Sequence, residues 1–258
     1  MVHIGIIPDG NRRWCKKNNI DLINLIDHWI NGMLLEFIKE IIRETNTFNE
    51  EKKQRMSQNL KGLKFKDMLF ESEKMINLKN EYRPLSDITE ISVYVSSIDN
   101  LSRNDKSVEI GYQFIKRFDY LVNNIKEITK FNINPIKLKL LLSKIKLNII
   151  GDIEKIPEDI LTILKKYNNS TFNQYVINIA IAYDYHKDIK QKENYIRNQS
   201  EIDIVFRSGG EMRLSGFFPT KVLYSELYFC KKLWPDIKLD DIRECLNEFY
   251  KRNRRFGK

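Results

Sequence analysis

The amino-terminal stretch Val2-His3-Ile4-Gly5-Ile6-Ile7-Pro8-Asp9-Gly10-Asn11-Arg12-Arg13-Trp14 joins two different sequence patterns. Residues 2–7 are mostly apolar and β-branched, which is typical of a strand buried on both faces of a parallel sheet. After Pro8 the side chains become acidic, amide and basic, with a glycine that permits a tight turn. Open parallel sheets bind their ligands at the carboxyl ends of strands. The stretch therefore predicts an α/β fold with a site directly after the first strand.

Four further runs repeat the strand pattern, at residues 91–95, 145–150, 175–182 and 202–206. Apolar stripes with helical spacing lie between them, over 34–42, over 110–121 and over 160–164, where Pro157 suits the first turn of a helix. Alternation of strands and helices predicts βαβ units. We therefore expect a single α/β domain over residues 1–258, with a mostly parallel central sheet and helices on both of its faces.

One segment departs from this alternation. Residues 45–89 are polar and rich in lysine, glutamate and asparagine. A structureless connection of that length is unusual inside a compact domain. The segment is interpreted as an inserted excursion within the domain, partly helical or a mobile flap.

Polar and glycine residues follow every predicted strand, in the segments 8–14, 96–103, 151–152, 183–186 and 207–216. Because parallel strands end at one edge of a sheet, these side chains are expected on one rim. Its four arginines suit phosphate oxygens: Arg12, Arg13, Arg207 and Arg213. Asp9 fits beside a phosphate when a cation such as Mg²⁺ lies between them. The rim therefore predicts two phosphorylated substrates, or a single long one.

Each motif taken alone has an ordinary structural explanation, as a turn, a solvated arginine pair or a loop. Neither glycine-rich segment matches the nucleotide-binding fingerprints GxxxxGK[ST] or GxGxxG. His3 and His28 are interpreted as packed or surface histidines rather than catalytic bases. Asp240 and Asp241 are interpreted as acids favoured at a helix N-terminus rather than as a metal motif. The coincidence of motifs at successive strand ends is what indicates a site.

Composition limits the alternatives. The 258 residues carry 44 Lys and Arg against 35 Asp and Glu, and 42% are apolar, which excludes a wholly disordered chain. No apolar run approaches the roughly 18 residues of a membrane span, and the start lacks the pattern of a signal peptide. Three scattered cysteines give neither a disulfide framework nor a zinc motif, which predicts a cytoplasmic protein. The net charge of +9 suggests nucleic-acid binding as an alternative function. The arginines gather at strand ends rather than in a continuous stripe, so no nucleic acid is expected as a partner.

In their order along the chain, the motifs resemble those of the cis-prenyltransferases, the family of undecaprenyl and dehydrodolichyl diphosphate synthases. The resemblance covers the chain apart from 45–89. Its motifs are Asp9–Trp14, Ser97–Asn100 with Arg103, Ile150–Asp152, Asp203–Glu211, Arg213–Ser215, Tyr224–Phe229, Leu233–Asp236 and Arg254–Gly257.

The resemblance implies a Mg²⁺-dependent enzyme that condenses isopentenyl diphosphate with an allylic diphosphate of geranyl to geranylgeranyl size, forming a Z double bond at each addition. It implies catalytic roles for Asp9, Ser97 and Asn100, and metal binding by Asp9 and Glu226. The implied substrate-binding residues are Gly10, Asn11, Arg12, Arg13, Trp14, His28, Arg103, Arg207, Arg213, Ser215, Arg255 and Gly257. It further implies a homodimer, an apolar tunnel between the sheet and the helices, and peripheral contact with a membrane through the lipid product.

Three positions depart from the family pattern. Asn24 stands where relatives usually carry an arginine, Leu101 where an aromatic is common, and 182–186 lacks two glycines and an arginine. These departures leave two alternatives beside chain elongation. One is an irregular condensing enzyme of the lavandulyl type, and the other is a non-catalytic subunit of a hetero-oligomer. Retention of Asp9 and of the 207–215 loop argues against the subunit.

Overall fold

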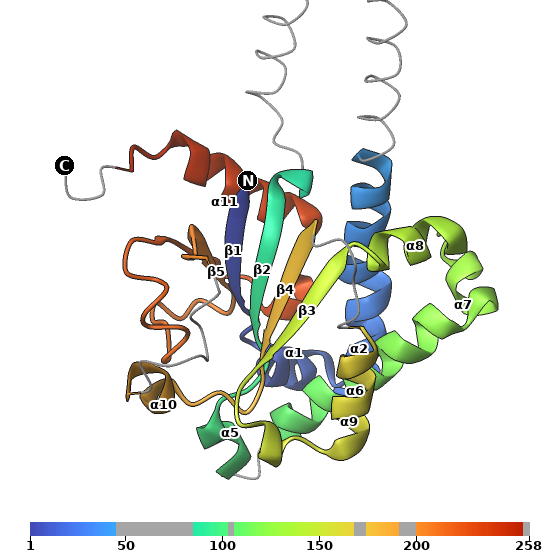
Figure 1. Cartoon of the computed structure of the whole chain (residues 1–258), viewed down its shortest axis with the longest axis horizontal. Helices are drawn as coiled ribbons and strands as arrows, with labels where there is room; N and C mark the ends of the chain where they lie inside the picture. Colours follow the sequence, from blue (N-terminus) through green and yellow to red (C-terminus); the bar gives the residue numbers. More distant parts are fainter. Residues whose placement is uncertain (45–84, 103–105, 168–173, 191–199, 255–258) are drawn as a thin grey trace, which may run out of the picture.

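The computed structural model describes residues 1–44, 85–102, 106–167, 174–190 and 200–254, and its centre is a six-stranded sheet (Figure 1). The strand order is β3-β4-β2-β1-β5-β6, and every neighbouring pair is parallel, as the sequence predicts. The strands are β1 (Val2–Ile7), β2 (Ile88–Tyr94), β3 (Ile145–Ile150), β4 (Tyr175–Ala180), β5 (Ile204–Arg207) and β6 (Glu226–Phe229).

The helices follow the predicted alternation with the strands. They are α1 (Asn11–Asn18), α2 (Leu22–Trp29), α5 (Ile98–Ser102), α6 (Lys106–Asn123), α7 (Ile125–Lys130), α8 (Pro135–Leu142), α9 (Glu158–Lys166), α10 (Tyr185–Lys190) and α11 (Leu239–Lys251). A π-helical turn over Ile30–Leu34 joins α2 to helical residues 35–44. Among the described residues, no helix has the length and apolarity needed to cross a membrane.

Several boundaries differ from the sequence-based expectation, among them the end of β4, at Ala180 rather than 182, and the start of β5, at Ile204 rather than 202. β2 begins at Ile88, three residues early, and Leu85 is fully buried, so residues 85–89 belong to the folded body rather than to an insertion. The remainder of that predicted insertion, 45–84, lies outside the described residues. Pro157 caps α9 instead of occupying its first turn. β6 was not predicted, because it has only four residues, of which the first is charged and two are aromatic.

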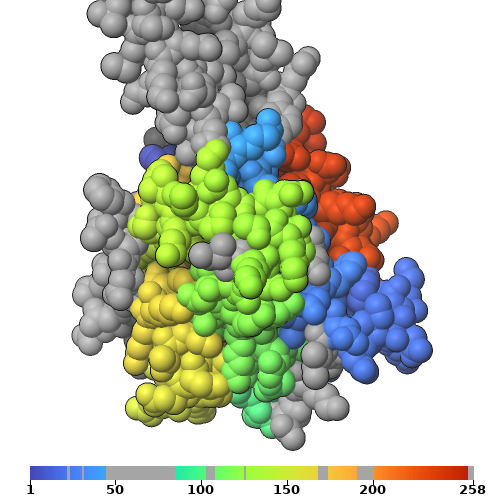
Figure 2. Space-filling model, turned by 90° about the vertical axis from the view of Figure 1, so that its right-hand side faces the viewer, coloured from blue at the N-terminus to red at the C-terminus, as the bar shows by residue number. Residues whose placement is uncertain are grey.

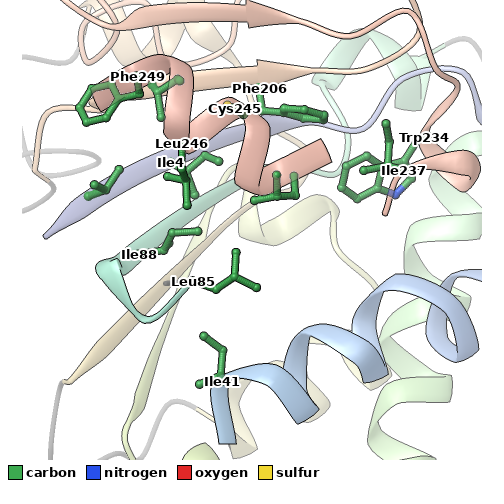
Figure 3. Close-up of a cluster of buried hydrophobic side chains, with 13 residues drawn as sticks. Ile4, Ile41, Leu85, Ile88, Phe206, Trp234, Ile237, Cys245, Leu246 and Phe249 are labelled. Carbon is green, nitrogen blue, oxygen red and sulfur yellow. The ribbon is translucent and has the colours of Figure 1, made fainter. Parts of the chain in front are cut away.

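Alternation along β1 separates the two faces of the sheet. Ile4 and Ile6 point to the face that carries α2, α6, α8 and α9, which Figure 2 shows from outside. On the same face α11 packs Leu246 and Phe249 over β1 and β5, beside Phe206 (Figure 3). Asp241 begins α11 by accepting a hydrogen bond from the backbone N–H of Lys238 at 2.8 Å, which confirms the capping interpretation.

The other face of the sheet is covered mainly by the chain between β5 and β6. Phe217 and Phe218 are fully buried there against Ile7 and Val205. This segment begins at the carboxyl end of β5, beside the end of β1. It therefore supports the strand ends from one side while the helices cover them from the other.

Candidate active site

The turn after β1 is built around Gly10. Its φ of 105° is in the region that favours glycine, and a Cβ there would lie 2.8 Å from Leu233 Cδ2. Gly10 caps α1 without any side-chain hydrogen bond. The backbone N–H groups of the first turn of α1 therefore lack helical partners and form an arrangement that suits an anion.

Arg207 joins the end of β5 to the end of β1. Its side chain is only 4% exposed, and Nη2 donates to Asp9 Oδ2 at 2.8 Å. Nη1 donates to Ser215 Oγ at 3.0 Å and to the carbonyl of Arg213. Arg207 Nε and Asn11 Oδ1 are buried without a hydrogen-bond partner among the described residues. Unsatisfied buried polar atoms at one site are unusual and are typical of positions completed by a ligand or water.

The loop after β5 approaches Asp9 very closely. Ser208 Oγ donates to the Asp9 carbonyl at 2.8 Å. Gly209 has a φ of 87°, and a Cβ there would lie 2.7 Å from Arg13 Nη2 and 3.1 Å from the backbone of Asp9. Glycine is therefore required for this contact between two motifs that are distant in the sequence.

The rim carries more positive than negative charge. Arg13 lies 3.5 Å from Asp9 Oδ1 and 3.7 Å from Glu211 Oε1, while Arg213 pairs with Glu211. Four arginines thus surround two carboxylates, since Arg12 also borders the site. Burial opposes ionisation of Asp9, but the hydrogen bond and charge of Arg207 outweigh it, so the pKa of Asp9 is lowered. Asp9 is a carboxylate at neutral pH.

Ser97 and Asn100 lie together at the start of α5. The hydroxyl of Ser97 donates to Asn100 Oδ1 at 2.8 Å, and the Ser97 backbone N–H donates to the same oxygen at 2.9 Å. Asn100 borders the cavity described below. The pair is therefore pre-oriented at the carboxyl end of β2, on the same rim as Asp9.

Tyr94 is a site residue that the sequence analysis did not identify. Its hydroxyl donates to the Ser215 carbonyl at 3.2 Å, and its ring packs against Tyr183 and Phe217. Burial raises the pKa of Tyr94 to about 12, against an opposing hydrogen bond with Ser97. The phenol therefore remains a donor at neutral pH. In the sequence, the only feature that could indicate a site role for Tyr94 is its position at the end of a strand.

An apolar cavity of about 770 Å³ opens on this rim. Asp9, Arg12, Arg13 and Arg213 border one end, at the carboxyl ends of the strands. The interior lies between the sheet and the helices, and its walls are almost entirely aliphatic and aromatic. They include Ile6, Ile91, Val93, Ile177 and Ile179 from the sheet, and Met33, Phe37, Phe114, Phe118, Leu138 and Leu141 from the helices.

The structure does not bring every predicted site residue to this cavity. In the sheet, Glu226 lies opposite Ile204, and Ile204 lies opposite Ile4. Ile4 is about 10 Å before the end of β1. The Glu226 side chain pairs with Arg252 at 2.7 Å. Within one chain it therefore does not meet Asp9, and the expectation of one shared ion is corrected on this point.

Trp14 and His28 also do not line the cavity. Trp14 is buried, donates to Asp236 Oδ1 at 2.6 Å and packs against the His28 ring at 4.7 Å. His28 Nε2 lies 3.0 Å from the Pro235 carbonyl. Both side chains attach α1 and α2 to residues 234–236, so they support the rim from behind. Three further predicted residues lie outside the described residues: Arg103, Arg255 and Gly257.

The sequence of the chain matches a known family of enzymes. The family model Prenyltransf, which describes undecaprenyl diphosphate synthases, matches residues 70–199 and 191–257. The chain belongs to this family of cis-prenyltransferases. An isoprenyl transferase of Rickettsia prowazekii (strain Madrid E) is 32% identical over 99% of this chain and 97% of its own. The expected family, enzyme class and prenyl-transfer reaction are thereby confirmed.

This cis-prenyltransferase is also similar to a second curated protein in sequence and to a solved structure in fold. A tritrans,polycis-undecaprenyl-diphosphate synthase (geranylgeranyl-diphosphate specific) of Pyrococcus abyssi (strain GE5 / Orsay) is 26% identical over 99% of this chain and 86% of its own. The crystal structure of lavandulyl diphosphate synthase from Lavandula x intermedia, in complex with dimethylallyl diphosphate, has a TM-score of 0.60 at 18% identity. It covers 99% of this chain and 98% of the other. At that identity the likeness shows the fold alone.

Proposed function

We propose that this cis-prenyltransferase elongates an allylic diphosphate of geranyl to geranylgeranyl size with isopentenyl diphosphate and holds the growing chain inside its cavity. The observation that carries the proposal is an apolar cavity of about 770 Å³ whose one polar end holds Asp9 and four arginines. A prenyl diphosphate has the same division, with a doubly phosphorylated head and a hydrocarbon tail. The geranylgeranyl specificity named for the Pyrococcus relative supports the larger primers.

The residues at the rim fit a bound Mg²⁺ ion. Among the described residues, no three His, Cys, Asp or Glu side chains gather as a metal cluster. Mg²⁺ does not need such a cluster, since one carboxylate with phosphate oxygens and waters completes its octahedral shell. Asp9 is ionised and 32% exposed, and Arg207 holds it in place through Oδ2. Oδ1 makes only the longer contact of 3.5 Å with Arg13 and would serve this role. When bound, the ion would stabilise negative charge on the leaving diphosphate.

Two groups of residues at the rim would bind the two substrate diphosphates. The first turn of α1, with Asn11, Arg12 and Arg13, would bind the allylic diphosphate, because its amides and guanidinium groups converge there. Arg207, Arg213 and Ser215 would bind the diphosphate of isopentenyl diphosphate. In the reaction a carbon–carbon bond forms between the two substrates, the allylic carbon–oxygen bond breaks, and a proton leaves the isopentenyl carbon chain.

Ser97 and Asn100 are proposed to assist that proton loss. Their mutual hydrogen bonds fix both side chains at the rim, and Asn100 borders the cavity. A neutral oxygen that accepts a proton transiently, and passes it to the departing diphosphate, balances the reaction without another co-reactant. Ser97→Ala and Asn100→Ala are expected to lower kcat more than they raise KM.

The direct test is incorporation of labelled isopentenyl diphosphate by the purified full chain with geranyl, farnesyl and geranylgeranyl diphosphate and Mg²⁺. Products longer than the primer, with mass increments of one isoprene unit, are expected. No incorporation by folded protein with any primer would overturn the proposal. Activity that arises only after mixing with a relative would instead indicate a non-catalytic subunit, and a branched product from dimethylallyl diphosphate alone would indicate the irregular reaction.

We also propose a homodimer, in the cytoplasm and in peripheral contact with a membrane. β6 is an edge strand. Leu223 and Tyr224, which precede it, are 76% and 64% exposed, and Leu227 within it is 36% exposed. Exposed apolar side chains at the outer edge of a sheet are typical of a surface that another chain covers. Sedimentation of Leu223→Glu should show dissociation, whereas Ile153→Glu, at another exposed apolar position, should not.

A further inference from the structure

Helix α8 exposes two large apolar side chains on its outer face. Ile136 is 78% exposed and Leu140 is 58% exposed. They are four residues apart, so they form one ridge along the helix. Lys137 and Lys139 fall on either side of that ridge, and both are exposed. We call these four residues the α8 surface, which lies on the side of the molecule viewed in Figure 2.

The charge around the α8 surface is strongly positive. Between residues 124 and 146 there are six lysines and one glutamate, a surplus of five out of the chain's net +9. The single glutamate, Glu127, is already paired with Lys130 at 2.7 Å. Lys137 and Lys139 have no ion pair with any carboxylate of the described residues. The surface therefore combines an apolar ridge with cations that have no counter-charge in the part of the chain that the structure describes.

The inner face of the same helix belongs to the apolar cavity. Leu138, Leu141 and Leu142 line it, together with Ile145 and Tyr175 at the amino ends of β3 and β4. This is the end of the cavity opposite to Asp9. One helix thus separates the far end of the cavity from the α8 surface.

We propose that the α8 surface docks onto an anionic lipid bilayer. Ile136 and Leu140 enter between the head groups, and the lysines pair with lipid phosphates. Exposed apolar side chains that insert between lipid head groups, together with lysines that attract anionic lipids, can hold a protein surface on a membrane. Charge complementarity favours an anionic membrane over an apolar protein groove, because the ridge is flanked by lysines on both sides. Docking would place a prenyl product close to the hydrocarbon of the bilayer, and this benefit rests on the proposed function. The docking itself does not depend on the proposed function.

The test is co-sedimentation of the full chain with vesicles, compared between mixed phosphatidylcholine–phosphatidylglycerol and phosphatidylcholine alone. Binding is expected only to the anionic vesicles and should weaken with added salt. Lys137→Gln with Lys139→Gln should weaken partitioning about 25-fold, since each lysine near an anionic surface contributes about fivefold. Ile136→Gln with Leu140→Gln should weaken it by at least about tenfold.

Matched controls separate the α8 surface from general charge and apolarity. Lys190→Gln with Lys251→Gln removes the same charge from α10 and α11, and Ile153→Gln with Ile189→Gln removes two other exposed isoleucines. Both control pairs should bind vesicles like the unaltered chain. Circular dichroism checks folding, and glutamine is retained well in helices.

Several outcomes would overturn the proposal. Equal binding to both vesicle types, or equal losses in the α8 and control pairs, would exclude docking through this surface. A change of oligomeric state in the α8 variants without a change in vesicle binding would indicate a protein contact instead. Incorporation of isopentenyl diphosphate with a short detergent-free primer is measured in parallel. Loss of vesicle binding with retained incorporation in the α8 variants supports the proposal. If the unaltered chain binds vesicles but incorporates no isopentenyl diphosphate, docking stands and the proposed function is refuted.

Discussion

Arg207 donates to Asp9 Oδ2 at 2.8 Å and so connects two residues that are 198 positions apart in the chain. The same guanidinium holds Ser215 and the Arg213 carbonyl. A single buried side chain therefore fixes the turn after β1 against the loop after β5. The proposed sites of both substrates depend on its position, although the pattern of the arginines alone suggested only phosphate binding.

We expect Arg207→Lys to weaken both the fold and the reaction. Lysine presents one ammonium group and cannot reproduce the fork that reaches three acceptor oxygens in two segments. Breaking a buried pair costs about 3–5 kcal/mol, and the exposure of Asp9 reduces this to about 2 kcal/mol. Urea unfolding and the KM for isopentenyl diphosphate measure the two effects. Arg117→Lys is the matched control, because Arg117 pairs with Asp27 at the surface and its replacement should change neither quantity appreciably.

Asp9→Asn tests the carboxylate itself. The amide has nearly the same shape and can still accept from Arg207, so the fold should be retained. We expect kcat to fall by at least about a hundredfold, because the anionic oxygen proposed to bind the metal is lost. The Mg²⁺ dependence of the remaining activity should also shift to higher concentration. Turnover near that of the unaltered chain in Asp9→Asn or Asp9→Ala would remove Asp9 from its proposed role.

Tyr94→Phe tests the residue that supports Ser215 from β2. The substitution keeps the ring contacts with Tyr183 and Phe217 but removes the donor to the Ser215 carbonyl. Ser215 has a φ of 52°, so its loop depends on such supports. We expect a KM for isopentenyl diphosphate raised about fivefold, in line with one hydrogen bond of about 1 kcal/mol, and little change in kcat.

The control for this variant is Tyr112→Phe. The Tyr112 hydroxyl is buried and has no hydrogen-bond partner among the described residues, so its removal deletes no contact that the site uses. An equal rise of KM in both variants would refute a specific role for Tyr94.

Much of the fold and part of the site could be predicted from local sequence pattern. β1 and β3 have the predicted bounds because each is a six-residue segment rich in β-branched residues that is followed directly by a turn residue, Pro8 or Gly151. Asp9 and Arg207 were predicted on one rim because parallel strands end at one edge. β6 escaped prediction because it has only four residues and begins with a glutamate, which leaves an apolar run of three residues.

Three side chains show that local sequence pattern does not determine which residues reach the site. Glu226 stands at the amino end of β6, and its place opposite Ile204 depends on sheet register. Trp14 follows the rim motif directly, but helical geometry turns it away from the cavity and into the contact with Asp236. Tyr94 has no unusual neighbour in the sequence, and its role depends on a loop more than a hundred residues later. Each of these outcomes is decided by tertiary contacts.

Ile91→Trp tests whether the cavity limits product length. Ile91 lies in the middle of β2 and faces the cavity, where the larger indole would occupy space needed by the growing chain. We expect the distribution of product masses to move to fewer isoprene units, with the first condensation retained. Ile153→Trp adds the same group at a half-exposed position outside the cavity and should leave the distribution unchanged. An unaltered product from Ile91→Trp would show that the chain extends elsewhere.

His3 makes the stability of the fold dependent on pH. It is part of strand β1 and only 4% exposed, with Nε2 at 2.8 Å from Ser92 Oγ and Nδ1 at 2.9 Å from Ser200 Oγ. Ser200 Oγ already donates to Glu90 Oε2 at 2.7 Å, and the Glu201 carbonyl lies 3.2 Å from Nδ1, so Nδ1 carries the proton of neutral His3 and Nε2 accepts from Ser92. Burial lowers the pKa of His3, against the opposing charge of Glu90.

The sign of the effect follows from proton binding. An unfolded histidine titrates near pH 6.5, above the folded pKa of His3, so the unfolded chain binds more protons between the two values. Stability contributed by neutral His3 is complete above about pH 6.5 and is lost as the pH falls below it. His3→Gln retains hydrogen-bonding atoms without the titration. Its Tm should therefore fall less than that of the unaltered chain between about pH 7.5 and about pH 5.5. His186→Gln, at an exposed position on α10, should keep the original slope, and an equal slope in His3→Gln would show that His3 does not carry this dependence.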